Sequence, residues 1–153
     1  EGKRVSPPAR EVKDAKQGIS YTYYEGQWDN LPNFDILTPK SQGVLNSFVF
    51  PEECSAEDFG TQYKGYIKLP KEGAYQFFVN SDDGSALIID DEIIVSNDGL
   101  HAPVEQSGIK YLSAGFHDIK VVFFQKGGGK AFDVSFEGPG LPKQIIPEGI
   151  LYY

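Results

Sequence analysis

Three short apolar runs follow one another between Tyr75 and Val95, and only turn-forming residues separate them. The runs are 75–79, 86–89 and 93–95. Each run has the length of a buried strand rather than a helix, and the short spacing predicts a hairpin that extends into a meander. No helical period persists elsewhere, so the sequence predicts an all-β antiparallel fold with little or no helix.

Further strands are expected on both sides of this meander. The candidates are 19–24, 65–69, 109–112, 117–124, 132–137 and 150–153. Residues 132–137 alternate between apolar and polar types, which indicates one buried and one wet face. Residues 35–63 give few regular signals, so we expect loops there, with one short strand at Phe48–Phe50. The last strand is expected to return beside the N-terminal one.

Size and charge limit the classes of protein to which the chain can belong. Its 153 residues suit one domain that folds alone. The net charge of -8 and the pI near 4.7 argue against a nucleic-acid partner and against anionic membranes, because both are bound through clustered Lys and Arg. No apolar run approaches the ~18 residues that a membrane-spanning helix needs.

The first 17 residues differ in composition from the rest of the chain. They mix charges with a Pro7-Pro8 pair and have no sustained apolar period, so 1–17 is predicted to be a linker from a preceding domain, and 18–153 the domain itself. The absence of Met leads us to expect a piece of a longer chain. The single cysteine, Cys54, cannot form an internal disulfide, and nothing near it in the sequence resembles an activating site for a nucleophile.

Asp82 and Asp83 place two adjacent carboxylates on the turn between the first two runs. One interpretation is a dense oxygen cluster for a hard cation such as Ca²⁺. The other is structural: the two carboxylates accept backbone N–H bonds and fix the turn, together with Ser81 and Ser85. A catalytic pair is not expected, because adjacent residues on one turn rarely face each other across a glycosidic bond.

An ordered set of motifs makes the chain resemble the PA14 family over roughly residues 18–153. The motifs are Gly65-Tyr66-Ile67-Lys68-Leu69-Pro70, Gly73-Ala74-Tyr75-Gln76-Phe77, Ser81-Asp82-Asp83-Gly84-Ser85, Asn97-Asp98-Gly99, Leu112-Ser113-Ala114-Gly115-Phe116-His117 and Gly138-Pro139-Gly140. The resemblance implies a PA14-type antiparallel β-sandwich or barrel, a module found in bacterial glycosidases, toxins and adhesins. The opening around Tyr24 and Trp28 fits as well. These aromatics are expected to anchor the first strand, the alternative being a platform for a sugar ring.

The resemblance also implies a site. In several sugar-binding members an Asp-Asp pair at this position, joined by a cis peptide, holds a calcium ion that binds sugar hydroxyls, so Asp82 and Asp83 are the expected metal ligands. In adhesin-like members an Asn or Asp side chain from the loop after the 117–124 strand completes the cation site. Here that loop is Lys126–Lys130 with Gln125 at its base, so it lacks such a side chain and adds two positive charges.

The predicted function is that of a non-catalytic carbohydrate-binding module in a larger secreted or cell-surface protein. The parent is expected to be a bacterial carbohydrate-active protein, and the module a monomer whose other contacts are with domains of the same chain. The alternative is a structural domain that packs on a neighbouring glycosidase domain and shapes its active-site entrance, without sugar affinity of its own. The expected ligand-binding residues are Asp82, Asp83, Asp98, His101, Gln125, Lys126, Gly127 and Gly128.

Overall fold

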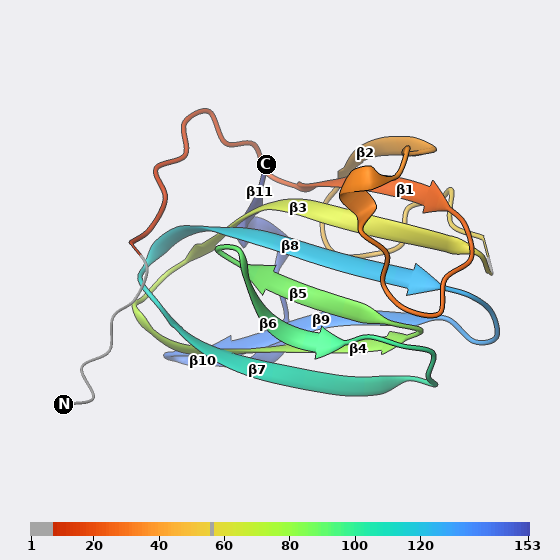
Figure 1. Ribbon diagram of the computed structural model, residues 1–153. Coiled ribbons are helices and arrows are strands. Elements are labelled where there is room, and N and C mark those ends of the chain that lie inside the picture. The colour runs from red at the N-terminus through yellow and green to blue at the C-terminus, as the bar shows by residue number, and fades with distance from the viewer. Residues whose placement is uncertain (1–7, 56) are drawn as a thin grey trace.

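Two antiparallel β-sheets pack face to face in the computed structural model, which describes residues 8–55 and 57–153 (Figure 1). The larger sheet has the strand order β2-β1-β3-β8-β5-β6, and β11 also pairs with β3, beyond the end of β1. The smaller sheet has the order β10-β9-β4-β7. This arrangement confirms the predicted all-β sandwich with little helix.

The larger sheet consists of β1 (Ile19–Glu25), β2 (Ser41–Leu45), β3 (Phe59–Leu69), β5 (Ser85–Ile89), β6 (Glu92–Asn97), β8 (Gly115–Gln125) and β11 (Leu151–Tyr152). The smaller sheet consists of β4 (Gly73–Asp82), β7 (Val104–Leu112), β9 (Ala131–Gly138) and β10 (Leu141–Ile145). Two short 3-10 helices, η1 (Phe34–Ile36) and η2 (Glu148–Ile150), lie in the connections. Within the described ranges, no helix has the length and apolar character needed to cross a membrane.

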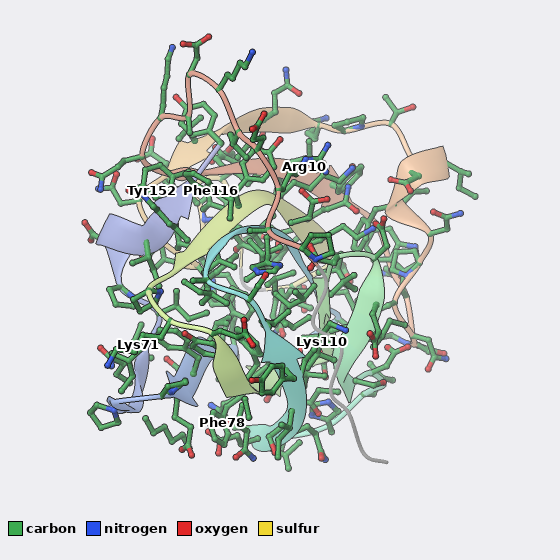
Figure 2. The ribbon with its side chains drawn as sticks, turned by 90° about the vertical axis from the view of Figure 1, so that its left-hand side faces the viewer. Arg10, Lys71, Phe78, Lys110, Phe116 and Tyr152 are labelled. Carbon is green, nitrogen blue, oxygen red and sulfur yellow. The ribbon has the colours of Figure 1, made fainter. Side chains whose placement is uncertain are left out.

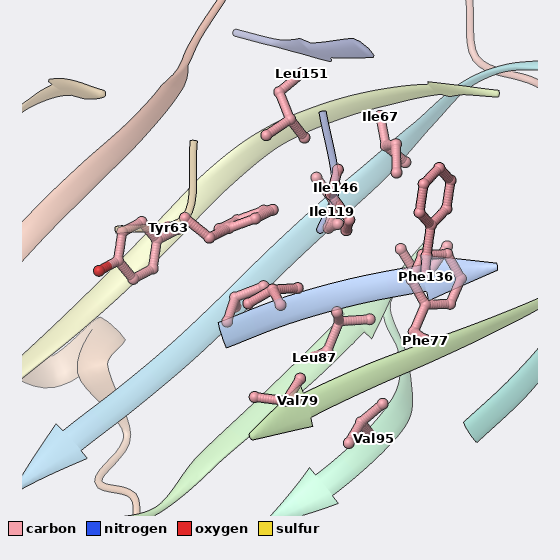
Figure 3. Close-up of a cluster of buried hydrophobic side chains, with 14 of the residues drawn as sticks. Tyr63, Ile67, Phe77, Val79, Leu87, Val95, Ile119, Phe136, Ile146 and Leu151 are labelled. Atoms are coloured by element: carbon pink, nitrogen blue, oxygen red, sulfur yellow. The ribbon is translucent and has the colours of Figure 1, made fainter. Parts of the chain in front are cut away.

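The core forms because alternate side chains along each strand point into the space between the sheets. Tyr75, Phe77 and Val79 of β4 are fully buried there, in one cluster with Ile119 and Val121 of β8. Figure 3 shows Phe77, Val79 and Ile119 of this cluster. β3 and β8 form the centre of the larger sheet, with eleven residue pairs in continuous register. The apolar area removed from water along these strands supplies most of the stability and makes both sheets a rigid support for the loops at their ends.

The first turn of the predicted meander is not a hairpin. β4 pairs with β7 and β9, whereas β5 pairs with β6 and β8, so the chain crosses from the smaller sheet to the larger one between Asp82 and Ser85. Both strands are buried over most of their length, which is why a continuous apolar run did not reveal the sheet to which each belongs. Only the second turn, between β5 and β6, joins hairpin partners.

The structure differs from the expectations in four further details. The short strand predicted at Phe48–Phe50 does not form, and β2 at Ser41–Leu45 was missed because its half-buried residues show only a weak pattern. β3 also begins at Phe59, earlier than expected. The last strand pairs with β3 rather than with β1, although it lies beside the residues that lead into β1, since the carbonyl of Leu151 accepts the N–H of Gly18.

The part of the predicted linker that the structure describes lies against the sandwich (Figure 2). The N–H of Arg10 donates to the carbonyl of Phe116 at 2.8 Å, and its guanidinium lies 2.6 Å from Asp118. Lys16 and Tyr153 exchange two backbone hydrogen bonds, of 3.0 and 2.9 Å. Residues 1–7 lie outside the described residues, and the domain boundary at residue 17 stays a prediction.

Candidate functional site

The candidate site is centred on the turn that joins β4 to β5. Asp82 ends β4, Ser85 begins β5, and the peptide bond between Asp82 and Asp83 is cis, as the resemblance implied. Both residues are buried, with exposed fractions of 6% and 5%. Two carboxylates therefore lie next to each other where the chain passes between the sheets, at the right-hand end of the sandwich in Figure 1.

Neighbouring polar side chains hold this turn in place. Ser81 Oγ and Ser85 Oγ are 2.6 Å apart, and Asn97 Nδ2 donates to Ser81 Oγ at 3.3 Å. The same amide nitrogen donates to the carbonyl oxygens of Val79 and Val104. These buried contacts show that the two serines stabilise the turn. Asn97 adds to them and links this turn to the one at Asn97–His101.

Asp83 connects its own turn to the Asn97–His101 turn and to the Gln125–Lys130 loop, which carry the other expected ligand-binding residues. Its Oδ1 accepts the backbone N–H of His101 at 3.3 Å, and its Oδ2 accepts the backbone N–H of Lys126 at 2.9 Å. The structural interpretation of the pair thus holds for Asp83. Each oxygen keeps lone-pair capacity for a further partner, because a carboxylate oxygen can accept more than one bond.

Asp82 has a different environment. Burial raises the pKa of its carboxyl above the usual 3.8, and the negative charge of Asp83 raises the pKa further. Gly129 comes close to this carboxyl, since a Cβ atom added there would lie 3.5 Å from Asp82 Oδ2. A buried like-charged pair is costly as it stands, and a bound cation would lower that cost.

Asp98 is exposed, and its carboxylate holds a neighbouring loop. Its Oδ1 accepts the N–H of Gly99 and the N–H of Leu31, both at 2.7 Å. It lies beside the carboxylate turn, because a Cβ atom on Gly84 would be 3.0 Å from the same oxygen. Asp98 therefore holds the loop before η1 against the site.

The ring of His101 is enclosed by its own turn. Nε2 lies 2.9 Å from the carbonyl oxygen of Asn97, and Nδ1 lies 2.9 Å from that of Ala102. Burial opposes the charged form, but these two hydrogen bonds and the charges of Asp83 and Asp82 outweigh it and raise the pKa of His101 above 6.5. His101 thus reaches the carboxylates through its backbone N–H, while its ring shapes the turn.

The loop after β8 is organised by Gln125. This buried residue donates its Nε2 to the carbonyl oxygens of Gly129, at 3.0 Å, and Gly128, at 3.4 Å. Gly128 has a φ of +78°, a conformation that side-chain-bearing residues rarely adopt. The glycine run thus lets the backbone fold closely over the Asp82 carboxyl.

The two lysines of this loop point away from the carboxylates. Lys126 Nζ lies 2.5 Å from Asp29 Oδ1. Lys130 Nζ donates to the carbonyl of Ser55 at 3.1 Å and lies 4.8 Å from the centre of the Phe50 ring. Both lysine ammonium groups of the loop thus contact residues other than Asp82 and Asp83.

Among the described residues, no group of three or more His, Cys, Asp or Glu side chains is placed to hold a metal ion. Calcium takes about 6 to 8 oxygens, so a cation at Asp82 and Asp83 would also need backbone carbonyls, water or ligand oxygens. The backbone carbonyls of the loop beside Asp82 are oxygens of that kind, and two of them, on Gly128 and Gly129, already accept from Gln125. The residues present therefore fit a calcium ion of which the two carboxylates are the only acidic ligands.

The comparison with family sequence profiles decides the affiliation. The profile of the PA14 domain matches residues 15–148. The chain belongs to the PA14 domain family. This PA14 domain has no match among curated protein sequences.

Solved structures share the fold of this PA14 domain. An anti-sigma factor domain-containing protein superposes with a TM-score of 0.76 at 21% identity, over 90% of this chain and 48% of that one. The PA14 sugar-binding domain from an RTX adhesin gives 0.73 at 15% identity, over 90% and 98%. The epithelial adhesin 9 A domain from Candida glabrata, solved in complex with Galb1-3GlcNAc, gives 0.74 at 14% identity, over 96% and 94%. At such identities the likeness establishes the fold, and this chain spans about half of the first protein's length.

The sequence did not predict that the loop between β1 and η1 borders the site. Leu31 contacts Asp98 and Asp29 contacts Lys126. The partners are 67 and 97 positions apart, so no local sequence pattern predicts either contact. Trp28 of the same loop packs its ring against Phe34, which supports the expected anchoring role. The nearest sequence signal is the density of turn-forming residues after β1.

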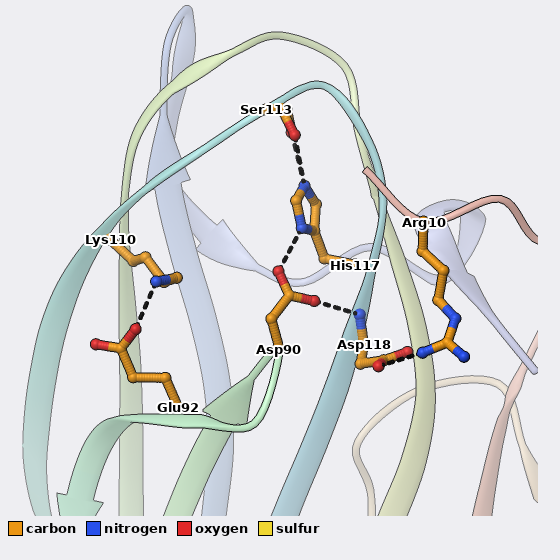
Figure 4. A network of polar contacts seen from close by, with 7 residues as sticks. All are labelled: Arg10, Asp90, Glu92, Lys110, Ser113, His117 and Asp118. Carbon is orange, nitrogen blue, oxygen red and sulfur yellow. Dashed lines mark hydrogen bonds and ion pairs between the residues drawn. The ribbon is translucent and has the colours of Figure 1, made fainter. Parts of the chain in front are cut away.

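A second polar cluster lies at the opposite end of this PA14 domain (Figure 4). His117 Nδ1 is 2.7 Å from Asp90 Oδ2, and Nε2 is 3.4 Å from Ser113 Oγ, a layout superficially like a hydrolase triad. However, Nε2 lies closer, 2.8 Å, to the carbonyl oxygen of Ser113, which can only accept. This nitrogen therefore carries a proton and cannot activate the hydroxyl, and His117 is fully buried. The cluster is structural.

Two other features do not add chemistry to the site. Burial raises the pKa of the Cys54 thiol to about 12, which disfavours the nucleophilic thiolate. A hollow of about 590 Å³ on the outer face of the larger sheet is lined by Lys64, Asp91 and Lys120 among others. Neither carboxylate of the turn lines this hollow, so it is separate from the candidate site.

Proposed function

We propose that this PA14 domain is a non-catalytic carbohydrate-binding module. Its sugar site lies at the rim formed by the Asp82-Asp83 turn, the Asn97–His101 turn and the Gln125–Lys130 loop. The observation that supports this most strongly is the adjacent, buried Asp82 and Asp83 pair, on which all three segments converge. Carboxylate oxygens align sugar hydroxyls either directly or through a bound cation.

In this proposal calcium is held by Asp82 and Asp83, with carbonyl oxygens of the 125–129 loop. When bound, the ion neutralises the carboxylate pair and attracts sugar hydroxyl oxygens. Gln125 orients the loop, and Asn97 with the two serines keeps the turn rigid. The raised pKa of Asp82, caused by burial and by Asp83, supports the fit of a divalent cation.

The wider context is also part of the proposal. The module belongs to a larger extracellular, bacterial carbohydrate-active protein, acts as a monomer, and contacts other domains of its own chain. The sugar-binding adhesin domains among its structural neighbours support the carbohydrate partner. The acidic net charge of -8 supports a partner other than nucleic acid or an anionic membrane.

Exposed apolar side chains favour a second candidate function. Ile36 on η1 is 79% exposed, and Ile93 on β6 is 65% exposed. A domain that packs against a neighbouring glycosidase domain would cover such residues. In this alternative the PA14 domain shapes the active-site entrance of its neighbour and has no sugar affinity of its own.

A glycan array separates the two functions. The domain is probed once with millimolar calcium and once with chelator, beside Asp82→Asn and the control Asp91→Asn. Asp91 is an exposed carboxylate on the turn between β5 and β6, at the other end of β5. The expected result is sugar binding that disappears in chelator and in Asp82→Asn but persists in Asp91→Asn.

Each other outcome has a defined meaning. Binding that survives chelator but not Asp82→Asn assigns the sugar contacts to the bare carboxylates and rejects the calcium. Silence of the wild type in both conditions overturns the carbohydrate-binding function and favours the packing role.

A further inference from the structure

The backbone and the side chain of Lys126 contact different carboxylates. Its N–H donates to Asp83 Oδ2 at 2.9 Å, so the residue borders the carboxylate pair directly. Its ammonium nevertheless lies 2.5 Å from Asp29 Oδ1, on the loop between β1 and η1. Lysine has a flexible four-carbon stem, so the same backbone position also lets the ammonium fold back toward Asp83.

The other lysine of the loop is held away by different partners. Lys130 Nζ donates to the carbonyl of Ser55 and lies over the rings of Phe50, at 4.8 Å, and Phe59, at 5.6 Å. These contacts draw its charge to the far side of the loop. Lys126 is therefore the lysine of this loop whose backbone borders the pair.

Asp29 is held in place by the loop that carries it. Two residues further on, the N–H of Leu31 donates to Asp98 Oδ1 at 2.7 Å. Two residues before, Gln27 Nε2 donates to Asp58 Oδ2 at 3.3 Å. The loop is thus tied on both sides of Asp29, which keeps its carboxylate in reach of the lysine ammonium.

We propose that Asp29 is a positioning residue for the cation site, because it keeps the Lys126 ammonium off the Asp82-Asp83 carboxylates. Without Asp29, the acidic side chains that remain around the ammonium are Asp58 and Asp83, and in the molecules where it pairs with Asp83 it competes with the ion. Calcium then binds only the fraction of molecules in which Lys126 is displaced, so its apparent affinity falls. The inference rests on the calcium site proposed above.

The test measures calcium binding by calorimetry on the intact domain and on Asp29→Asn, Lys126→Gln and the double variant. The ion pair with Asp29 is exposed to solvent and therefore weak, so Asp29→Asn is expected to weaken calcium binding about 1.4- to fivefold. In the Lys126→Gln background the same change has no effect, because the competitor is absent. Glu92→Gln, which breaks a 2.5 Å ion pair with Lys110 at the other end of β5, is the matched control and leaves affinity unchanged.

The double variant distinguishes competition between Lys126 and calcium from a long-range effect of the Asp29 charge on calcium. If Asp29→Asn weakens binding equally with Lys126 and with Gln at that position, the effect is general electrostatics and the positioning role is overturned. Unchanged affinity in Asp29→Asn overturns it as well, while the calcium site stands. If the wild type binds no calcium at millimolar concentration, the cation site itself fails, and the role of Asp29 fails with it.

Discussion

The backbone N–H of Lys126 donates a 2.9 Å hydrogen bond to Oδ2 of Asp83, although 43 positions separate the two residues. The other oxygen of that carboxylate accepts the N–H of His101. One buried side chain thus fixes two loops relative to the turn between β4 and β5. Within the described part of the chain, the neighbouring Asp82 holds no second loop in this way, and its carboxyl contacts that of Asp83 instead. This difference leads to opposite expectations for the two carboxylates.

Asp83→Ala should destabilise the domain. The change leaves the N–H groups of His101 and Lys126 without their acceptor, and buried unsatisfied donors cost about 1–3 kcal/mol. Urea denaturation in chelator measures the loss. An unfolding free energy equal to that of the wild type would contradict the proposed task of Asp83.

Asp82→Asn should have the opposite effect at neutral pH in chelator. A carboxyl whose pKa is raised in the folded state is a penalty only when it is ionised, so the penalty is absent below the unfolded value of 3.8 and develops as pH rises through the folded pKa. The variant is therefore expected to gain unfolding free energy at pH 7 and to lose this advantage toward pH 3. Denaturation curves at both pH values test the sign.

His101 predicts a second pH dependence. Because its pKa is raised in the folded state, its stabilising contribution is complete below the unfolded value of 6.5 and is lost as pH rises through the folded pKa. Thermal unfolding in chelator should thus occur at lower temperature at pH 8 than at pH 6. The difference should shrink in His101→Gln, and an equal difference in both proteins would assign it to other groups.

Asp90→Ala tests the network at the opposite end. Its carboxylate accepts the N–H of Asp118 and binds the ring of the fully buried His117, so its removal should cost about 1–3 kcal/mol of unfolding free energy. Part of any loss comes from placing alanine at a positive φ. Asp91→Ala controls for this, because Asp91 has a φ of 66° beside 48° for Asp90. The loss in Asp90→Ala should exceed that in Asp91→Ala.

Gly108→Ala should strongly destabilise the sandwich. A Cβ atom on Gly108 would lie 1.8 Å from the carbonyl oxygen of Ile94, a backbone atom that cannot move aside cheaply. Overpacking of this kind costs about 1–3 kcal/mol or more. Gly127→Ala is the control, since its nearest neighbour would be the Glu57 carboxylate at 3.5 Å. Chemical denaturation should separate the two variants clearly.

Cys54 should resist thiol reagents in the folded protein. Burial raises its pKa to about 12, so little thiolate is present at pH 8. Alkylation by iodoacetamide is expected to be slow in buffer and fast in urea, followed by mass spectrometry. Rapid labelling of the folded domain would contradict the burial of this thiol.

Periodicity predicted the fold class but not the assignment of strands to sheets. The runs at 75–79 and 86–89 are apolar enough to be buried in either sheet, so their tight spacing predicts a hairpin that the structure does not have. The two strands belong to different sheets because β4 pairs with β7 and β9, whereas β5 pairs with β8. These partner strands lie far away in the sequence. A local pattern carries no information about such partners.

The site was predictable only where its residues are contiguous. Asp82 and Asp83 stand together on a turn and were found by inspection, and the structure brings His101 and Gln125–Lys130 to them as predicted. Asp29 and Leu31 were not found, because their partners come from distant loops. Asp98 was identified, but its hydrogen bonds to backbone N–H groups depend on a geometry that its sequence neighbourhood does not specify.

The close approach at Gly108 also concerns association between molecules. It brings β7, at the edge of the smaller sheet, against β6, at the edge of the larger one, so the unpaired backbone groups along this side are shielded from another chain. The other edge of the smaller sheet is β10, where Pro142 offers no N–H and Lys143 adds a charge. Strand-by-strand pairing with another molecule is thus opposed at the β6–β7 side by the protein's own backbone and at β10 by a proline, which leaves β2 as the edge open to a partner strand.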